Sequence, residues 1–301
     1  MKILITGSNG LLGQKLIAAL RNDPEVTLIA TSRGEDRTPN ALGDHYRSLD
    51  ISIKSEVDAV FDTVRPDTVI HTAAMTNVDA CELDPVACKL QNVTATENLI
   101  TASKKHNAHF IFLSTDCIFD GKNGPYREED AAAPLSIYGQ SKLDGEQLVM
   151  NSGLAHWAIA RTIIVYGVAA GLSRSNVVLW AKGALEKGSP INVVDDQYRM
   201  PTLAEDLADG CIRIAKRKAQ GVYHLCGPDG MTILELVQRV AKYYELDDKI
   251  VTRIDSASLS QPAERPPRTG FVLDKARKDL GYTPHSFEEG LDVLTKQLKG
   301  G

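Results

Sequence analysis

A tyrosine and a lysine stand four positions apart in the segment YGQSK, which runs from Tyr138 to Lys142. On a helix, two residues at this spacing project from one face, one turn apart. A lysine ammonium beside a phenol favours the phenolate and lowers the pKa of the phenol from its usual value of about 10. The spacing therefore predicts a tyrosine that gives and takes a proton near neutral pH, although two solvated residues on a helix share the same pattern.

Thr115 provides a hydroxyl group that can act beside this pair. It follows an apolar run at residues 109–113, which predicts a buried strand, and Tyr138 begins the next expected helix. Both positions then fall at the carboxyl edge of a parallel sheet, where ligands bind. The Thr115 hydroxyl can hydrogen-bond a substrate carbonyl while Tyr138 gives it a proton, and Lys142 can hold the tyrosine's charge and reach a nicotinamide ribose. The predicted chemistry is a hydride transfer, with the protein positioning cofactor and proton.

Three glycines, Gly7, Gly10 and Gly13, lie between an expected strand at residues 2–6 and an expected helix. Glycines in such a turn let backbone N–H groups approach a pyrophosphate and let the helix pack against the strand. The spacing is GxxGxxG rather than GxGxxG. Its place between a strand and a helix favours a dinucleotide site.

The next expected strand, at residues 26–31, is followed by Ser32 and Arg33, with Arg37 close by. A site selective for NAD usually places an acidic residue here to hold the ribose 2′-hydroxyl. An arginine instead matches a 2′-phosphate. The sequence therefore predicts NADPH, with NADH as the second choice and an exposed loop arginine as the alternative interpretation.

Strands and helices alternate through the N-terminal half. Further strands are expected at 45–51 and 68–72, and helices at 57–64 and 84–105. This alternation predicts an α/β fold with a Rossmann-type doubly wound parallel sheet, followed by a smaller mixed α/β substrate domain. We assign residues 1–166 and about 203–222 to the dinucleotide-binding domain, and about 167–202 and 223–301 to the substrate domain. In the C-terminal part we expect helices at 173–187, 203–216, 232–244 and 287–298, and strands at 190–194 and 221–226.

The net charge, the apolar runs and the cysteines of the chain argue against several classes of protein. The chain has 301 residues and a formal net charge of -5, which argues against nucleic acid or an anionic membrane as the main partner. No signal peptide or membrane span is visible. Five cysteines form no CxxC pair, as expected for reduced thiols in the cytoplasm, and predict no metal site.

Beyond these patterns, the chain resembles the extended short-chain dehydrogenase/reductase family, and within it the dTDP-4-dehydrorhamnose reductases. The resemblance covers nearly the whole chain. It rests on the glycine turn and on an ordered series of motifs: RPDTVIHTAA at 65–74, STDCIFDG at 114–121, PLSIYGQSK at 134–142, VYG at 165–167, DDQYRMPT at 195–202 and RP at 265–266.

The resemblance implies NADP(H)-dependent reduction of the C4 keto group of a dTDP-linked 6-deoxysugar, leading to dTDP-L-rhamnose. It implies Thr115, Tyr138 and Lys142 as the catalytic residues. Implied cofactor contacts, besides Tyr138 and Lys142, are Gly7, Asn9, Gly10, Leu11, Leu12, Gly13, Ser32, Arg33, Asp50, Ile51, Thr72, Ala73, Ala74, Thr76 and Asn92. Expected substrate contacts are Thr76, Asp116, Phe119, Gln197 and Arg265, the last holding a diphosphate unless its loop is a plain linker.

Two positions depart from the family pattern. Cys117 stands where an aromatic residue is usual, and Ile164 replaces a tryptophan of the sugar pocket, either as a retuned pocket wall or as an ordinary buried strand residue. Two other functions stay open: a non-catalytic NADP-binding regulatory subunit similar to that of methionine adenosyltransferase, and a nucleotide-sugar epimerase or dehydratase. The resemblance leaves the oligomeric state open, with a homodimer as one outcome.

Overall fold

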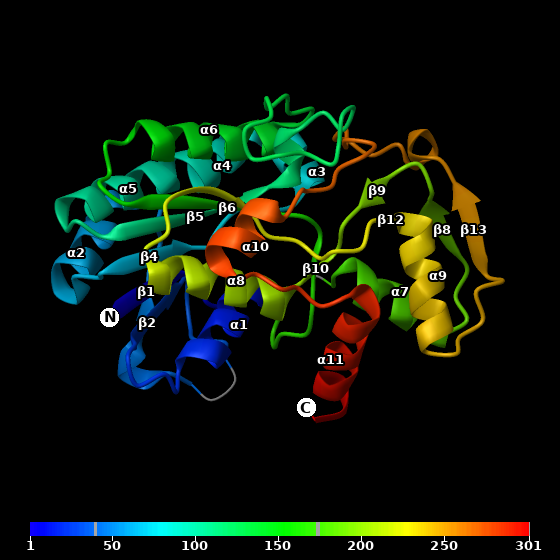
Figure 1. Cartoon of the computed structure of the whole chain (residues 1–301), viewed down its shortest axis with the longest axis horizontal. Coiled ribbons are helices and arrows are strands. Elements are labelled where there is room, and N and C mark those ends of the chain that lie inside the picture. The colour runs from blue at the N-terminus through cyan, green and yellow to red at the C-terminus, as the bar shows by residue number, and fades with distance from the viewer. Residues whose placement is uncertain (39–40, 173–174, 301) are drawn as a thin grey trace.

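A parallel sheet of seven strands forms the centre of the computed structural model, which describes residues 1–38, 41–172 and 175–300 (Figure 1). Its strands lie in the order β11-β6-β5-β4-β1-β2-β3. They are β1 (Lys2–Thr6), β2 (Thr27–Ser32), β3 (Tyr46–Ser48), β4 (Thr68–His71), β5 (His109–Thr115), β6 (Trp157–Thr162) and β11 (Gly221–His224). The strand order reverses between β1 and β4, so ligands are expected in the crevice at the carboxyl ends of these strands. The predicted fold class is confirmed.

Helices cover both faces of this sheet (Figure 1). On one face, α1 (Leu11–Leu20), α8 (Ala204–Arg217) and α10 (Asp274–Leu280) bury apolar side chains such as Leu16, Ile214 and Leu280. On the other, α2 (Lys54–Val64), α5 (Ala95–Lys105) and α6 (Ile137–Asn151) do the same through Phe61, Leu99 and Val149. The strands are apolar on both sides because both faces are covered.

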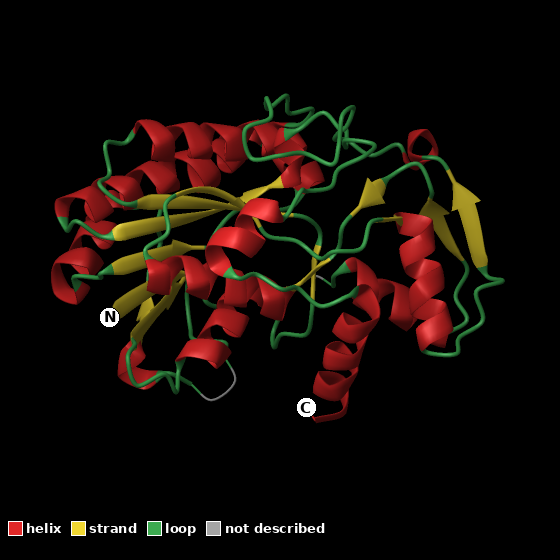
Figure 2. Cartoon of the chain, viewed as in Figure 1, coloured by secondary structure: helices red, strands yellow, loops and turns green. Residues whose placement is uncertain are grey.

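In the C-terminal part, away from the central sheet in Figure 2, lie the helices α7 (Val177–Glu186), α9 (Ile233–Tyr243) and α11 (Phe287–Gly300). Their apolar side chains form a cluster of their own. Beside it, β8 (Ile191–Val194) pairs in parallel with β13 (Val251–Ile254). Two small ladders complete the strands: β7 (Val165–Tyr166) with β10 (Thr202–Leu203), and β9 (Tyr198–Arg199) with β12 (Met231–Thr232). The division into two domains at the stated boundaries stays a prediction.

Three expected elements differ most from those observed. The helix expected at 84–105 is broken into α4 (Pro85–Lys89), a π-helical turn η2 (Leu90–Thr94) and α5, after a separate helix α3 (Val78–Leu83). Proline at the first position of α4 lacks the N–H that would continue α3, and the Asp84 carboxylate caps the new start. The strand expected at 45–51 is shorter, since a 3₁₀ turn η1 (Gly43–His45) precedes β3. The helix expected from residue 173 begins at Val177, and residues 173–174 lie outside the described residues.

Short turns and loops complete the chain. They include the 3₁₀ turns η3 (Asp116–Ile118), directly after β5, and η4 (Ser256–Leu259). Within the described ranges, none of the helices is long and apolar enough to span a membrane.

Candidate active site

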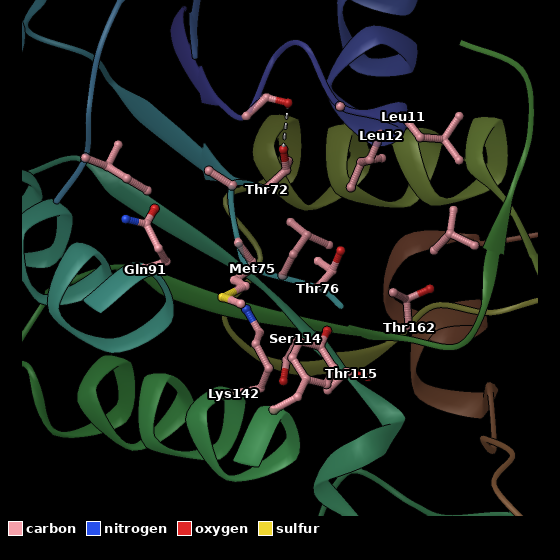
Figure 3. Close-up of a pocket in the computed structure, with 18 of the residues that line it drawn as sticks. Leu11, Leu12, Thr72, Met75, Thr76, Gln91, Ser114, Thr115, Lys142 and Thr162 are labelled. Carbon is pink, nitrogen blue, oxygen red and sulfur yellow. Dashed lines mark hydrogen bonds between the residues drawn. The ribbon is translucent and has the colours of Figure 1, made fainter. Parts of the chain in front are cut away.

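A cavity of about 880 Å³ opens at the carboxyl ends of the central strands. It brings together most of the predicted site residues: Gly7, Gly10, Leu11, Leu12, Ser32, Arg33, Ile51, Thr72, Ala73, Ala74, Thr76, Thr115, Asp116, Tyr138 and Lys142 all line it. Figure 3 shows Leu11, Leu12 and Thr72 on one side of the cavity and Thr115 and Lys142 across it. The residues predicted to hold a cofactor and those predicted to transfer a proton therefore share one space.

At one wall of this cavity, the glycine turn allows neighbouring segments of the backbone to approach one another closely. Gly7 adopts φ +73, and a Cβ there would lie 2.7 Å from the backbone nitrogen of Ala73. Gly10 caps α1 without a side chain, so the first N–H groups of the helix face the cavity beside Leu11 and Leu12. Gly13 does not line the cavity. A Cβ at Gly13 would lie 2.3 Å from the Gly7 carbonyl oxygen, so this glycine lets the helix pack on the turn.

The cofactor-specificity end of the cavity lies where β2 stops. Ser32 and Arg33 line it, and the Arg33 side chain is exposed. Asn9, a predicted cofactor contact, instead holds the following loop: its Oδ1 accepts from the Arg37 backbone N–H at 2.9 Å, and its Nδ2 donates to the Glu35 carbonyl. Asp50 likewise closes a turn by accepting from the Ser52 backbone and hydroxyl. Neither Asn9 nor Asp50 is part of the cavity lining.

Tyr138 and Lys142 lie on the inner face of α6, and both are nearly buried, with 8% and 3% of their surface exposed. The helix begins at this position because the Ser136 hydroxyl accepts from the Gly139 backbone N–H. A Cβ at Gly139 would lie 2.2 Å from the Cys117 carbonyl oxygen, so glycine lets α6 approach the loop after β5. The expected Tyr–Lys spacing on one helical face is observed.

The expected direction of the Tyr138 pKa is wrong for the protein alone. Burial raises the pKa of Tyr138, the nearby Cys117 adds to the rise, and a hydrogen bond with Thr115 opposes it. Burial also lowers the pKa of Lys142 to about 8, because an apolar surrounding disfavours the ammonium. The phenol therefore holds its proton at neutral pH, as a proton donor must.

Thr115 and Asp116 form a hydrogen-bonded pair at the end of β5. The Thr115 hydroxyl donates to Asp116 Oδ1 at 3.1 Å and accepts from the Cys117 backbone N–H at 3.2 Å. Asp116 Oδ2 accepts from the Thr269 hydroxyl and lies 3.8 Å from Arg199 Nε. Asp116, predicted to bind substrate, thus lines the cavity while being held from the C-terminal half of the chain.

Besides Asn9, Gly13 and Asp50, four more predicted contacts lie away from the cavity lining. Asn92 accepts from the Met75 backbone N–H and donates to the Ser141 hydroxyl, so it ties the loop after β4 to α6. Phe119 is fully buried and stacks on Tyr126 with ring centroids 4.0 Å apart. The remaining two are Gln197, which is buried, and Arg265.

Arg265 is placed differently from the prediction of a diphosphate ligand. Its guanidinium donates to Asp79 Oδ2 at 2.7 Å and to the Ala263 carbonyl. A cation paired with a carboxylate is already neutralised, so the structure does not present it to the cavity.

Several lining residues were not predicted. Gln91 and Met75 lie at one side of the cavity and Thr162 at the other (Figure 3). Thr162 could have been found, since it ends a parallel strand at the ligand-binding edge, whereas nothing in the sequence marks Gln91. Ile164, noted as a departure, lines the cavity with φ +27, a left-handed conformation that is strained for a β-branched residue.

Together these groups can hold a dinucleotide against the glycine turn and protonate an oxygen that lies between Thr115 and Tyr138.

Comparison with known proteins gives four matches that cover most of the chain. The family model described as RmlD substrate binding domain matches residues 1–299. The chain is 32% identical over 253 residues to methionine adenosyltransferase 2 subunit beta of Xenopus laevis, covering 81% of this chain and 72% of that protein. It is 34% identical over 280 residues to a Streptomyces antibioticus protein named "Probable dTDP-4,6-dihydroxy-2-methyloxan-3-one 4-ketoreductase", covering 92% and 88%. The crystal structure of dTDP-4-dehydrorhamnose reductase from Bacillus anthracis str. Ames in complex with NADP matches with a TM-score of 0.84 and 28% identity, covering 98% of this chain and 99% of that one.

Proposed function

Because the chain belongs to the RmlD substrate binding domain family, we propose that it is an NADP(H)-dependent oxidoreductase acting on a nucleotide sugar. The reaction is reduction of the C4 keto group of a dTDP-linked 6-deoxysugar, as in dTDP-L-rhamnose biosynthesis. The observation that carries this proposal is the single cavity in which Gly7 and Gly10 face Thr115, Tyr138 and Lys142. The reductase complexed with NADP, similar along nearly its whole length, supports NADPH as the cofactor.

Each group of residues has a distinct role in this reaction. The Gly7–Gly10 turn and the start of α1 hold the pyrophosphate. Bound NADPH supplies the hydride that forms the new C–H bond at the carbonyl carbon. Tyr138 gives its proton to the carbonyl oxygen, and the elevated pKa that burial produces keeps that proton in place until it is needed. Thr115 orients the same oxygen, and the Lys142 ammonium compensates the phenolate left behind.

The remaining site assignments are part of this proposal. Ser32 and Arg33 hold the 2′-phosphate, Ile51 borders the adenine, and Thr72, Ala73, Ala74 and Thr76 contact the rest of the cofactor. Thr76 and Asp116 bind the substrate from the cavity wall. The dinucleotide domain comprises residues 1–166 and about 203–222, and the rest forms the substrate domain.

A second candidate function has a specific observation in its favour, the similarity to methionine adenosyltransferase 2 subunit beta. In that case the chain binds NADP but acts by binding another protein. A nucleotide-sugar epimerase that recycles a tightly held cofactor is the third.

One assay separates the three. Purified protein is mixed with NADPH and the dTDP-4-keto sugar, and loss of NADPH absorbance is followed together with the sugar product. Stoichiometric NADPH oxidation with formation of the 4-hydroxy sugar supports the reductase. NADPH binding without oxidation, together with stimulation of a methionine adenosyltransferase, supports the regulatory subunit. Product formed without net NADPH loss, by protein that already carries cofactor, supports the epimerase.

We further propose that the reaction takes place in the cytoplasm and that a homodimer is one assembly open to the protein. Cys81, Cys88, Cys117, Cys211 and Cys226 are all free thiols, which fits a reducing compartment. Sedimentation velocity of the purified protein tests the dimer, since a monomer mass across the working concentration range contradicts it.

A further inference from the structure

The Lys142 ammonium has an unusual setting for a buried charge. The residue is 3% exposed and lines the cavity, and no hydrogen bond or ion pair found among the described residues involves its Nζ. Nζ lies over an aromatic ring, 4.0 Å from the centroid of Phe112. An ammonium within about 6 Å of a ring centroid is attracted by the negative face of the ring.

Phe112 is held in this position from several sides. It lies in β5, is fully buried, and its ring centroid is 5.8 Å from that of His71 on the neighbouring strand. On α6, a Cβ at Gly145 would lie 2.5 Å from Phe112 Cζ. Gly145 therefore gives the ring the space to lie under Lys142, three residues earlier on the same helix.

Other titratable groups near Lys142 include a carboxylate and an imidazole that already have hydrogen-bond partners. The carboxylate of Glu146 on α6 favours the ammonium, but both its oxygens accept from Arg161 on β6, at 2.9 and 2.7 Å. Cys88 on α4 also favours it. His71 on β4 hydrogen-bonds Thr6 and Thr96, and burial holds its pKa down to about 3, so it stays neutral.

We propose that Phe112 is a positioning residue for Lys142: the face of its ring holds the ammonium at the cavity wall, in the place from which it acts on Tyr138 and the cofactor. The role of Lys142 in turnover, and with it the effect of Phe112 on turnover, rests on the proposed function. The contact itself does not depend on that function and can be measured without substrate.

The first test is the titration of Lys142 in the free protein. Lysine labelled with ¹³C at the ε carbon is incorporated, and the Lys142 resonance is assigned by its loss in Lys142→Arg. Its midpoint is compared in the wild type, Phe112→Leu and Phe110→Leu. Phe110 is the matched control, because it is equally buried in β5 and its ring lies 5.9 Å from His71.

Removing an attraction that favours the ammonium must make the lysine easier to deprotonate. We expect the midpoint of Phe112→Leu to fall by about one pH unit below that of the wild type, and that of Phe110→Leu to stay unchanged. Equal midpoints in the two leucine variants overturn the proposal.

A second substitution keeps the test valid if Phe112→Leu fails to fold. Placing 3,5-difluorophenylalanine at position 112 nearly preserves the shape of the ring while it weakens the negative potential of its face. We expect a smaller fall of the Lys142 midpoint in the same direction. A midpoint equal to that of the wild type shows that the ring serves only as packing and contradicts the proposal.

An activity measurement separates failure of this inference from failure of the proposed function. If the midpoint shifts but no variant, including the wild type, oxidises NADPH with the keto sugar, the Phe112–Lys142 contact stands and the proposed function fails. If the wild type turns over and the pH profiles of the two leucine variants coincide, the proposed function stands and the role of Phe112 fails.

Discussion

The hydroxyl of Thr269 donates a hydrogen bond to Oδ2 of Asp116, 153 positions earlier in the chain. The other oxygen of this carboxylate accepts from the Thr115 hydroxyl at 3.1 Å. Since a hydroxyl has a single hydrogen, Thr115 gives it to Asp116 in this structure and must turn it away from Asp116 to hydrogen-bond a substrate carbonyl. The C-terminal loop thereby sets the orientation of a hydroxyl group proposed to contact the substrate.

Thr269→Val should lower kcat more than it changes KM for NADPH. The substitution removes the hydrogen bond that holds Oδ2 of the buried Asp116 carboxylate. The carboxylate can then rotate, so its other oxygen no longer holds the Thr115 hydroxyl in place. We expect kcat to fall about tenfold, from the loss of a hydrogen bond to a charged group. Steady-state kinetics tests this, with Thr101→Val on the exposed surface of α5 as the control. Equal kcat in the two variants contradicts the role given to Thr269.

Gly13→Ala should destabilise the protein although Gly13 does not touch the cavity. A Cβ there would lie 2.3 Å from the Gly7 carbonyl oxygen, so α1 must move away from the turn. We expect a loss of about 3 kcal/mol in the free energy of unfolding, as for other overpacked sites. Urea unfolding measures it. Gly183→Ala in α7 is the control, because a Cβ there meets nothing within 4 Å and should stabilise the helix by about 0.5–1 kcal/mol.

Arg33→Ala should weaken NADPH binding without affecting NADH. Loss of a charged partner for a 2′-phosphate is expected to raise the Kd for NADPH by about tenfold or more. Fluorescence titration of both coenzymes checks this prediction. Arg47→Ala provides the comparison, since Arg47 is also exposed but donates only to nearby backbone carbonyls. If the wild type binds NADH more tightly than NADPH, the cofactor assignment is wrong.

The pH dependence of turnover should reflect Lys142. Its pKa is lowered to about 8, so the side chain is charged below that pH and loses its charge as the pH rises through it. We therefore expect kcat/KM to decline above about pH 8. Lys142→Arg carries a charge that is not lost in this range, so its activity, though reduced, should show no such decline. A decline of the same shape in both enzymes rules out Lys142 as its source.

The sequence allowed much of the fold to be predicted, because the relevant signals are local. The apolar run of β1, the glycines after it and the Thr232 cap of α9 depend on neighbours a few residues away, and the structure has them as expected. The helix expected at 84–105 is one exception, since periodicity alone does not show the π-helical turn at Leu90–Thr94 that interrupts it.

Two features of the site could not be predicted, for different reasons. Pairing of Arg265 with Asp79 joins positions 186 residues apart, which no spacing rule anticipates. The pKa of Tyr138 was expected to fall because the Lys142 charge was considered and burial was not. In the folded protein, desolvation is the largest influence on both groups and acts against both charged forms.

The proton that Tyr138 gives to the substrate is the centre of this account, and Tyr138→Phe tests it directly. Single-turnover oxidation of bound NADPH is followed after mixing with the dTDP-4-keto sugar, and NADPH affinity is measured separately. We expect wild-type turnover, a loss of at least about 100-fold in the rate of the variant, and little change in its NADPH affinity. A variant that oxidises NADPH at the wild-type rate would contradict this expectation.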